Sequence, residues 1–500
     1  MAETYDIIIR NGRVMDPETG FDEVCDLAVS GDTIAKIGKV EGAAAREIDA
    51  TGLIVAPGFI DLHAHGQSVA ADRMQAFDGI TTTLELEVGA LPVAGWYDRH
   101  AKLPRPLNYG TAVAWIFARK VALGALELNA DIHPIDQMGS GSDDMSWSTE
   151  AATLEQTEEI CALVRQGLDE GAIGIGIPNG YAPGAGMKEM VGVCSLAYEY
   201  NTPTFTHIAY MSNIDPRSSV DSYVRLIGLA GATGAHMHIC HLNSTSLMDI
   251  ENVVGLVEKA QEQGLPVTTE AYPYGTGATV VSAGFFMDPD FKARTGSDYS
   301  NIELVHNHQR FADRDDIVRA REENPTNIVM WHYLDVEVNE DHRRLLDMSV
   351  TYPGGSIASD AMPWLESDGS IYEGMDWPLP DHLSAHPRSS GTFTKFLREY
   401  VREREIVPLM EAIAKCTILP GKVIENCATQ IKRKVRLQEG CDADIVIFDF
   451  DTITDRAEFT AMNRPSEGVR HLLVNGVPVI SDGALDPDAA PGRPIRCTPA

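Results

Sequence analysis

Two histidines separated by one residue follow an apolar run near the start of the chain. The segment 56–66 reads APGFIDLHAHG and carries Asp61, His63 and His65. Residues two apart on a strand share a face, so these three side chains are expected to point the same way, with the histidines nearest the carboxyl end of the strand. Neutral imidazole is a common ligand of Zn²⁺, and two imidazoles at one strand end predict a metal site.

The next apolar run adds carboxylates to these histidines. Residues 79–89 read GITTTLELEVG and are interpreted as the second strand of a barrel. Strand alternation then predicts that Glu85 and Glu87 point inward together with Thr81 and Thr83, while the leucines between them face the helices. A buried carboxylate needs a cation, a proton or several donors. Glu87, nearer the carboxyl end, is therefore the better candidate ligand.

Three further residues end later apolar runs. TPTFTH ends at His207, HMHICH ends at His241, and GSIASDAMPW contains Asp360. Catalytic groups of parallel barrels lie at the carboxyl ends of successive strands, which is where a metal centre would collect these side chains. A carboxylate at the position of Asp360 can bind a metal and accept a proton from water. Two other His-x-His pairs lack this context and are interpreted as surface or helix-facing residues: His236 with His238, and His306 with His308.

The elements that must position these residues alternate between strands and helices. About 370 residues, 57–426, show apolar strands followed by amphipathic stretches such as 153–170 and 248–263, which predicts a TIM-like (β/α)₈ barrel of the α/β class. Short strands and tight turns in 1–56 and 427–500 predict a small β-sandwich formed by both termini. Residues 287–345, polar and without a strand-helix rhythm, are expected to form a lid insertion.

The charge composition disfavours some classes of binding partner. Forty lysines and arginines against 73 aspartates and glutamates give a net charge of −33, which disfavours nucleic acids and anionic membrane surfaces. The eight cysteines show no C-x-x-C spacing, and the N-terminus does not read as a secretory signal, so a reduced, cytoplasmic protein is expected. Oligomeric state, including a homo-oligomer, is left open.

As a set, the motifs resemble the amidohydrolase superfamily and, within it, the D-aminoacylase (N-acyl-D-amino-acid deacylase) family. The matching segments run through nearly the whole chain in order: PGFIDLHAHG, GITTTLELEVG, THIAY, ICHLN, TEAYPYGTGAT, IASDAMPW, HPRSSGTF, GCDADIVIFD and VNGVPV. The resemblance implies the same barrel with a terminal β-sandwich and one or two Zn²⁺ ions. It also implies that His63, His65, His207, His241 and Asp360 are metal ligands, and that Asp360 is the general acid/base.

Three features depart from the family pattern. Where relatives carry a cysteine ligand at the end of the second strand, this chain offers Glu87, whose carboxylate suits a bridging role between hard or borderline cations. The basic residues that follow the third and fourth histidines in the family are replaced by Ala209 and Asn243. The segment between Asp360 and Arg388 is also longer than the family pattern leads us to expect.

The residues predict a metal-dependent hydrolase, and the resemblance implies a linear amide as the bond cleaved, an N-acyl amino acid as substrate and the D-enantiomer. Tyr272 or Tyr274 would stabilise the oxyanion, and Arg388 would bind the substrate carboxylate through its bidentate guanidinium. One alternative is a hydantoinase-like hydrolase of cyclic amides or imides, although the segment GAIGIGIPNG lacks the lysine that those relatives carboxylate. The other is a non-catalytic metal-binding relative.

Overall fold

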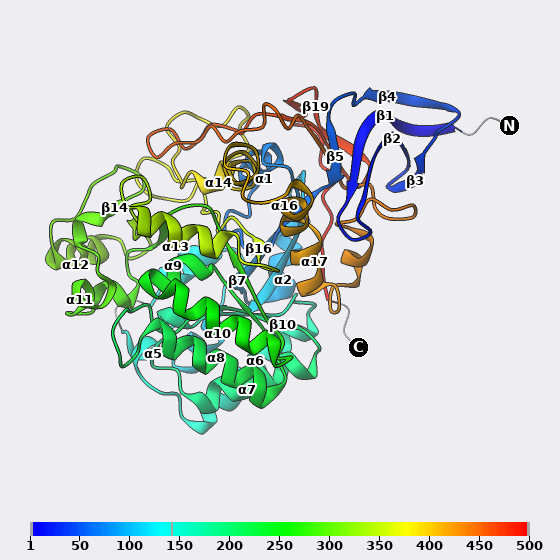
Figure 1. Ribbon diagram of the computed structural model, residues 1–500. Coiled ribbons are helices and arrows are strands. Elements are labelled where there is room, and N and C mark those ends of the chain that lie inside the picture. The colour runs from blue at the N-terminus through cyan, green and yellow to red at the C-terminus, as the bar shows by residue number, and fades with distance from the viewer. Residues whose placement is uncertain (1–3, 142–143, 498–500) are drawn as a thin grey trace.

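A computed structural model describes residues 4–141 and 144–497, and its centre is a barrel of eight parallel strands (Figure 1). The strands follow one another in chain order, and the register is parallel at each pairing. A parallel bridge from Ala64 to Ala361 joins the first strand to the last. The barrel strands are β6 (Phe59–Asp61), β7 (Ile80–Ala90), β8 (Asn108–Ala114), β9 (Ile175–Pro178), β10 (Pro203–His207), β11 (His236–Ile239), β12 (Val267–Ala271) and β16 (Ser356–Ile357).

Helices cover the outside of this barrel. The predicted helix 153–170 is confirmed as α6, in which Thr153 forms a capping box with Gln156 and Ile160 and Val164 are buried at helical spacing. The predicted helix 248–263 is confirmed as α10. The main helices around the strands are α1 (Val69–Phe77), α2 (Val93–His100), α3 (Trp115–Ala122), α6 (Leu154–Asp169), α7 (Met187–Glu199), α8 (Ser219–Thr233), α10 (Ile250–Glu262), α13 (Glu340–Val350), α16 (Leu409–Cys416) and α17 (Ile418–Ile424).

Strands from both ends of the chain form one nine-stranded sheet beside the barrel. The N-terminal and C-terminal groups meet where β5 pairs antiparallel with β17, and β5 leads through Gly58 directly into the first barrel strand. The terminal β domain therefore holds the base of β6, while the domain limits themselves stay predictions. Its strands are β1 (Thr4–Asp16), β2 (Phe21–Ser30), β3 (Thr33–Gly38), β4 (Ala43–Asp49), β5 (Ile54–Pro57), β17 (Ile445–Phe448), β18 (Val469–Val474), β19 (Val477–Ser481) and β20 (Ala484–Leu485).

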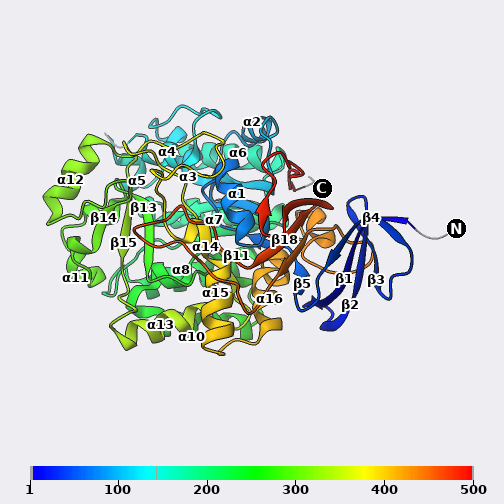
Figure 2. The ribbon, with the colours of Figure 1, turned by 90° about the horizontal axis from the view of Figure 1, so that it is seen from above.

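The region 287–345, whose sequence shows no strand-helix rhythm, contains helices and strands. A three-stranded antiparallel sheet in the order β13-β15-β14 forms its base. It lies on the side of the barrel away from the terminal sheet in both views (Figures 1 and 2). These strands are difficult to recognise in the sequence because each is only three to five residues long. Its elements are β13 (Thr276–Val280), α11 (Phe291–Thr295), β14 (Ile302–Leu304), α12 (Arg314–Glu323) and β15 (Ile328–His332).

The end of the described chain returns to the barrel. Pro494 forms a parallel bridge with Tyr109 of β8, and the Ile495 side chain is buried with residues of the barrel strands and of α17. This segment closes the base of the barrel, opposite the carboxyl ends of the strands. Within the described residues, no helix combines the length and hydropathy needed to cross a bilayer.

Candidate active site

His63 and His65 leave the end of β6 and converge inside the mouth of the barrel. Their Nε2 atoms lie 3.1 Å apart, and both side chains are buried. Asp61 does not share their direction, which corrects the expectation of one common face. Its carboxylate accepts hydrogen bonds from the backbone N–H of Ser359 at 3.0 Å and from the side-chain amide of Gln75 at 3.0 Å, and burial raises its pKa to about 6. Asp61 therefore links β6 to the end of β16 and to α1.

The Glu87 carboxylate lies between two pairs of histidines. Its Oε1 atom is 3.0 Å from His207 Nδ1 and 2.9 Å from His241 Nε2. Its Oε2 atom is 3.2 Å from His63 Nε2 and 3.5 Å from His65 Nε2. Burial alone would raise the pKa of Glu87, but the charges of His63 and His241 outweigh burial and hold this pKa well below its usual range. One carboxylate thus contacts ligand candidates from three different strand ends.

The route by which Glu87 reaches this position differs from the predicted strand alternation. Leu84 and Leu86 are buried with Phe205 and Cys240 inside the barrel, while the Thr83 hydroxyl donates to Gln75 of α1 on the outside. The predicted inward face of β7 is therefore wrong over this part of the strand. An inward-facing Glu87 thus cannot be explained by regular alternation.

An irregular register in β7 brings Glu87 into the mouth. Glu85 pairs with Thr111 of β8, and the next pair is Ala90 with Val113. Between these two pairs the chain advances by five residues in β7 but by only two in β8, so β7 bulges here. The displaced backbone crosses close to β9, where a Cβ added at Gly176 would come within 2.4 Å of the Glu87 carbonyl oxygen. Only glycine accommodates this approach.

Asp360 follows β16 and faces the first histidine pair. Its Oδ1 atom lies 3.3 Å from His65 Nε2 and 3.4 Å from His63 Nε2, and its backbone has a φ of 50°, which a non-glycine residue adopts at a cost. Its Oδ2 atom lies 2.9 Å from Arg388 Nη2. Burial raises the pKa of Asp360, but the charges of Arg388 and His63 lower it by more, so the pKa of Asp360 is below its usual range. The carboxylate is therefore ionised at neutral pH.

The side chains of Arg388, Tyr272 and Tyr274 lie in different places relative to the pocket. Arg388 is buried with its guanidinium carbon 4.7 Å from the centre of the Tyr272 ring, and its Nε and Nη1 atoms have no hydrogen-bond partner in the described chain. Tyr272 lines the pocket above the histidines. Tyr274 does not reach it, because its hydroxyl donates to the Gly391 carbonyl at 2.9 Å. The predicted oxyanion role of Tyr274 is therefore wrong.

Asn243, at a position where the family pattern has a basic residue, supports the tyrosines. Its Nδ2 atom donates to the Tyr272 carbonyl at 3.0 Å and to the Tyr333 hydroxyl at 2.8 Å. The other such position, Ala209, is buried and brings no charge. Neither position supplies a cation to the pocket.

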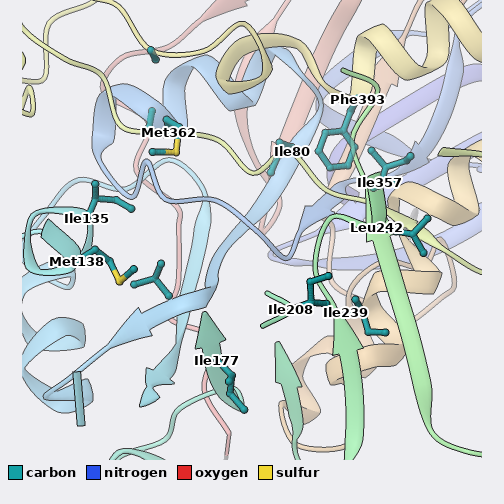
Figure 3. Close-up of a cluster of buried hydrophobic side chains, with 14 of the residues drawn as sticks. Ile80, Ile135, Met138, Ile177, Ile208, Ile239, Leu242, Ile357, Met362 and Phe393 are labelled. Atoms are coloured by element: carbon teal, nitrogen blue, oxygen red, sulfur yellow. The ribbon is translucent and has the colours of Figure 1, made fainter. Parts of the chain in front are cut away.

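The walls of the pocket are apolar and come from segments that the sequence did not single out. Ile135 and Met138 of α4 (Pro134–Gly139) lie on the same side of the buried cluster as Met362 (Figure 3). Among the described residues, no lysine or arginine lines this pocket. Tyr181 adds a phenol whose ring is 5.1 Å from that of His207 and whose hydroxyl is 2.6 Å from Thr279 Oγ1. Other wall residues are Met211, Val280, Phe285, Trp331 and Tyr333.

The donor set fits a divalent metal. The Nδ1 atoms of His63 and His65 lie 2.6 Å from Glu270 and 2.9 Å from Glu85, so these nitrogens carry the ring protons. Their Nε2 atoms face each other and carboxylate oxygens, so these contacts are satisfied either by a proton on an imidazole or by a divalent cation between the side chains. Groups of three such ligand atoms lie within 4.8 Å of one another, including His63 with His241 and Asp360, and Glu87 with His207 and His241.

Comparison with known proteins agrees with this geometry. The model of the amidohydrolase family matches residues 46–254 and 243–480, and the chain belongs to this family. N-acyl-D-glutamate deacylase of Alcaligenes xylosoxydans xylosoxydans is 28% identical over 99% of this chain and 97% of that protein. D-aminoacylase of the same organism is 26% identical over 100% of this chain and 99% of that protein. The predicted membership of the amidohydrolases is confirmed, and the protein is of the hydrolase class.

Solved structures confirm the predicted barrel with its additional β domain. N-acyl-D-glutamate deacylase of Bordetella bronchiseptica, solved with zinc and a phosphonate inhibitor, superposes with a TM-score of 0.76 at 23% identity and covers 99% of this chain and 100% of its own. A D-hydantoinase superposes with a TM-score of 0.57 at 18% identity, covering 99% of each chain. The fold is therefore nearer to that of the deacylase than to that of the hydantoinase.

Proposed function

We propose that this protein hydrolyses the linear amide bond of an N-acyl amino acid with the help of one or two divalent metal ions, Zn²⁺ being the first choice. The observation that carries the proposal is the convergence of His63, His65, Glu87, His207, His241 and Asp360 at one end of the barrel. Relatives named for the deacylation of N-acyl-D-amino acids support the linear amide. The D-configuration rests on those relatives alone.

The ligands divide into two sets that share Glu87. His63, His65 and Asp360 face its Oε2 atom, and His207 and His241 face its Oε1 atom. A carboxylate that spans two positions takes the place of the thiolate in the family pattern. Zn²⁺ held there lowers the pKa of water and polarises the amide carbonyl.

Asp360 carries the proton in this proposal. Its ionised carboxylate accepts a proton from the attacking water and then delivers it to the leaving nitrogen, because an amine leaves only after protonation. Arg388, 2.9 Å away, orients the carboxylate and keeps it ionised before water arrives. The Tyr181 and Tyr272 phenols line the pocket and are two of the protein groups placed to donate to the oxygen of the substrate carbonyl.

Arg388 is also the candidate anchor for the substrate carboxylate. A buried guanidinium with two unpartnered nitrogens favours an anionic ligand, since an unsatisfied buried donor is costly. The ion pair with Asp360 uses Nη2, and because Nε and Nη1 point to opposite sides of the guanidinium, a substrate carboxylate would accept from one of them and not from both. Arg388 does not line the pocket itself but packs against Tyr272, which does, so a carboxylate that reaches the guanidinium past Tyr272 would lie beside the proton carrier.

The apolar walls indicate the remainder of the substrate. Ile135, Met138, Phe285 and Trp331 offer no charge to a second carboxylate, and burying one without a cation is strongly unfavourable. We therefore expect an uncharged, apolar side chain or acyl group, in contrast to the glutamate and aspartate derivatives in the names of two relatives.

The geometry of the site favours neither alternative. The end of β9, where a hydantoinase-like enzyme would place a lysine, reads Gly176 to Gly180 without one, and the space between the histidine pairs is taken by Glu87. A non-catalytic relative would not need Asp360 in contact with both histidines and an arginine. The cytoplasmic location and the oligomeric state stay predictions.

The test is a metal analysis paired with turnover of N-acetyl and N-formyl D- and L-amino acids. We expect one or two equivalents of bound metal and release of the free amino acid, most rapidly from substrates with apolar side chains. A matched series of cyclic ureides, such as 5-substituted hydantoins, serves as the control. Turnover of the cyclic series alone would contradict the proposal.

A further inference from the structure

One wall of the pocket is a short helix that is not part of the regular strand-helix order of the barrel. This helix, α4, lies in the long connection between α3 and α6. Its residues Ile135 and Met138 line the pocket above the histidines. Helices shorter than about 12 residues are marginal on their own, and α4 has only six, so contacts with the rest of the chain must hold this wall in place.

The carboxyl end of α4 is bound by one buried lysine of the barrel. Lys120 Nζ lies 2.7 Å from the carbonyl oxygen of Met138. It lies 3.0 Å from that of Gln137 and 2.8 Å from that of Ser140, the residue that ends the helix. The last carbonyls of a helix lack partners within the helix, and these three match the three N–H donors of an ammonium group. Met138 thus turns its side chain to the pocket and its backbone to Lys120.

The lysine is enclosed by the segment that follows α4. Its Nζ atom lies 4.2 Å from the centre of the Trp147 ring, and the Trp147 indole N–H donates to the Gly141 carbonyl at 3.0 Å. Lys120 is fully buried and forms no ion pair with a carboxylate of the described residues, and burial lowers the pKa of Lys120 to about 7. Burying this amino group is costly, and its contacts with the carbonyls of α4 offset the cost.

Lys120 itself belongs to a well-packed part of the molecule. It lies on α3, directly after β8, and its neighbour Arg119 is also buried and forms an ion pair with Glu189 of α7. Arg119 Nε donates to the Trp147 carbonyl at 2.6 Å. The barrel therefore holds the connection through two adjacent side chains, and Lys120 is the one that reaches the pocket wall.

We propose that Lys120 is a positioning residue that holds α4 against the substrate, so that Ile135 and Met138 select substrates whose apolar group fills this side of the pocket. The inference rests on the proposed function and identifies a specificity-determining wall of the same site. A wall that is fixed before the substrate arrives costs less to order on binding. Loss of the anchor should therefore weaken binding and leave the chemical step unchanged.

The experiment compares K120M, which keeps the length of the side chain but removes its donors, with the wild-type protein. The substrates are N-acetylglycine, N-acetylleucine and N-hexanoylglycine, so that either the side chain or the acyl group is enlarged. KM should rise by about tenfold for the enlarged substrate whose apolar group meets α4, while KM for N-acetylglycine and every kcat stay near the wild-type values. M138A should have a similar effect. The double variant should add little to either, because both changes act through one contact.

Lys415 provides the matched control. It is another buried lysine whose Nζ atom donates to backbone carbonyls, those of Tyr352 and Gly355, but it lies on α16. K415M should therefore leave the ratios of KM between the three substrates at their wild-type values.

Hydrogen exchange of the backbone amides of residues 134–141 tests the anchor without a substrate. K120M should raise the exchange rate of this segment by about tenfold, and K415M should not change it. Unchanged exchange in K120M, an equal rise in K415M or additive KM effects in the double variant would overturn the inference while the proposed function stands. Should K120M fail to fold, M138A decides, and unchanged KM values in M138A would overturn the inference. If the wild-type protein hydrolyses no N-acyl amino acid, the proposed function falls, and the exchange rates alone decide whether Lys120 anchors α4.

Discussion

The floor and the walls of the pocket are built in opposite ways. The floor is made of charged side chains and candidate metal ligands at the carboxyl ends of barrel strands, among them His63, His207 and Asp360. The walls are apolar and come from α4 and from the insertion, as Met138 and Trp331 illustrate. A floor of this kind is suited to the chemical step, and a wall of this kind is suited to selecting the substrate.

The two faces of the β13–β15 ribbon show the same contrast between charged and apolar surroundings. Trp331 and Tyr333 face the inner pocket, whereas His332 and Leu334 face an outer cleft on the other side. Strand alternation separates the two sets, because successive residues point to opposite faces. Charged residues gather in the outer cleft, including Arg310, Arg343, Lys395, Arg398 and Arg464. One ribbon thus separates an apolar enclosure from a charged surface, and variants on its two faces should behave differently.

The largest effect is expected on the floor, at Asp360. D360N keeps an oxygen toward the metal position but cannot carry the proton, so kcat should fall by about 10²–10⁴ while bound metal is largely retained. Steady-state kinetics and metal analysis of the same preparation check this. D335N, in the exposed outer cleft, is the matched control and should keep the wild-type kcat. Wild-type turnover in D360N would remove Asp360 from the mechanism.

Glu87 should affect metal binding at both positions. E87Q replaces the shared anion by a neutral amide, and removal of one charged ligand should weaken binding by at least the 10–100-fold typical of an outer partner. Chelator competition on the stripped protein measures the change. E303Q changes a carboxylate of the insertion that contacts His332 and provides the control. Equal weakening in E303Q would show that the effect is not specific to the site.

Arg388 lies at the junction of floor and substrate. R388K keeps the positive charge but replaces the planar guanidinium by an ammonium group. Loss of one charge-assisted hydrogen bond should raise KM for N-acyl amino acids by about tenfold, with a smaller change in kcat. The corresponding N-acyl amines, which lack a carboxylate, should be insensitive to the change. A kcat effect that exceeds the KM effect would mean that Arg388 serves Asp360 more than the substrate.

The smallest effect is expected at the wall. F285A should raise KM for substrates with bulky apolar groups by severalfold, since truncation removes roughly 1–2 kcal/mol of apolar contact, and should leave kcat for N-acetylglycine nearly unchanged. F291L lies in the same aromatic cluster, with its ring 5.6 Å from that of Trp331, but does not line the pocket. Kinetics across a series of side-chain sizes separate the two variants. Equal losses in both would indicate a general loosening of the insertion.

The structure differs from the predictions made from the sequence in the positions of individual side chains. Glu87 lies at the predicted place, although by way of an irregular register and not by strand alternation. Tyr274, two residues from Tyr272, turns to Gly391 because β12 ends at Ala271 and the chain bends at Pro273. Glu85 and Glu270 could have been suspected, since each sits on the strand of a candidate motif, but their partners lie on other strands.

By itself, the sequence determined the class of fold, the terminal β domain and the histidine and aspartate residues of the floor. These features are local, because each motif is an apolar run followed directly by the side chain that it presents, and the carboxyl ends of parallel strands meet by construction. Only the tertiary structure decided the inward position of Glu87, the carboxylates behind His63 and His65, and the apolar walls around them. Each of these depends on contacts between residues far apart in the chain, and a one-residue change of register reverses which face a side chain occupies.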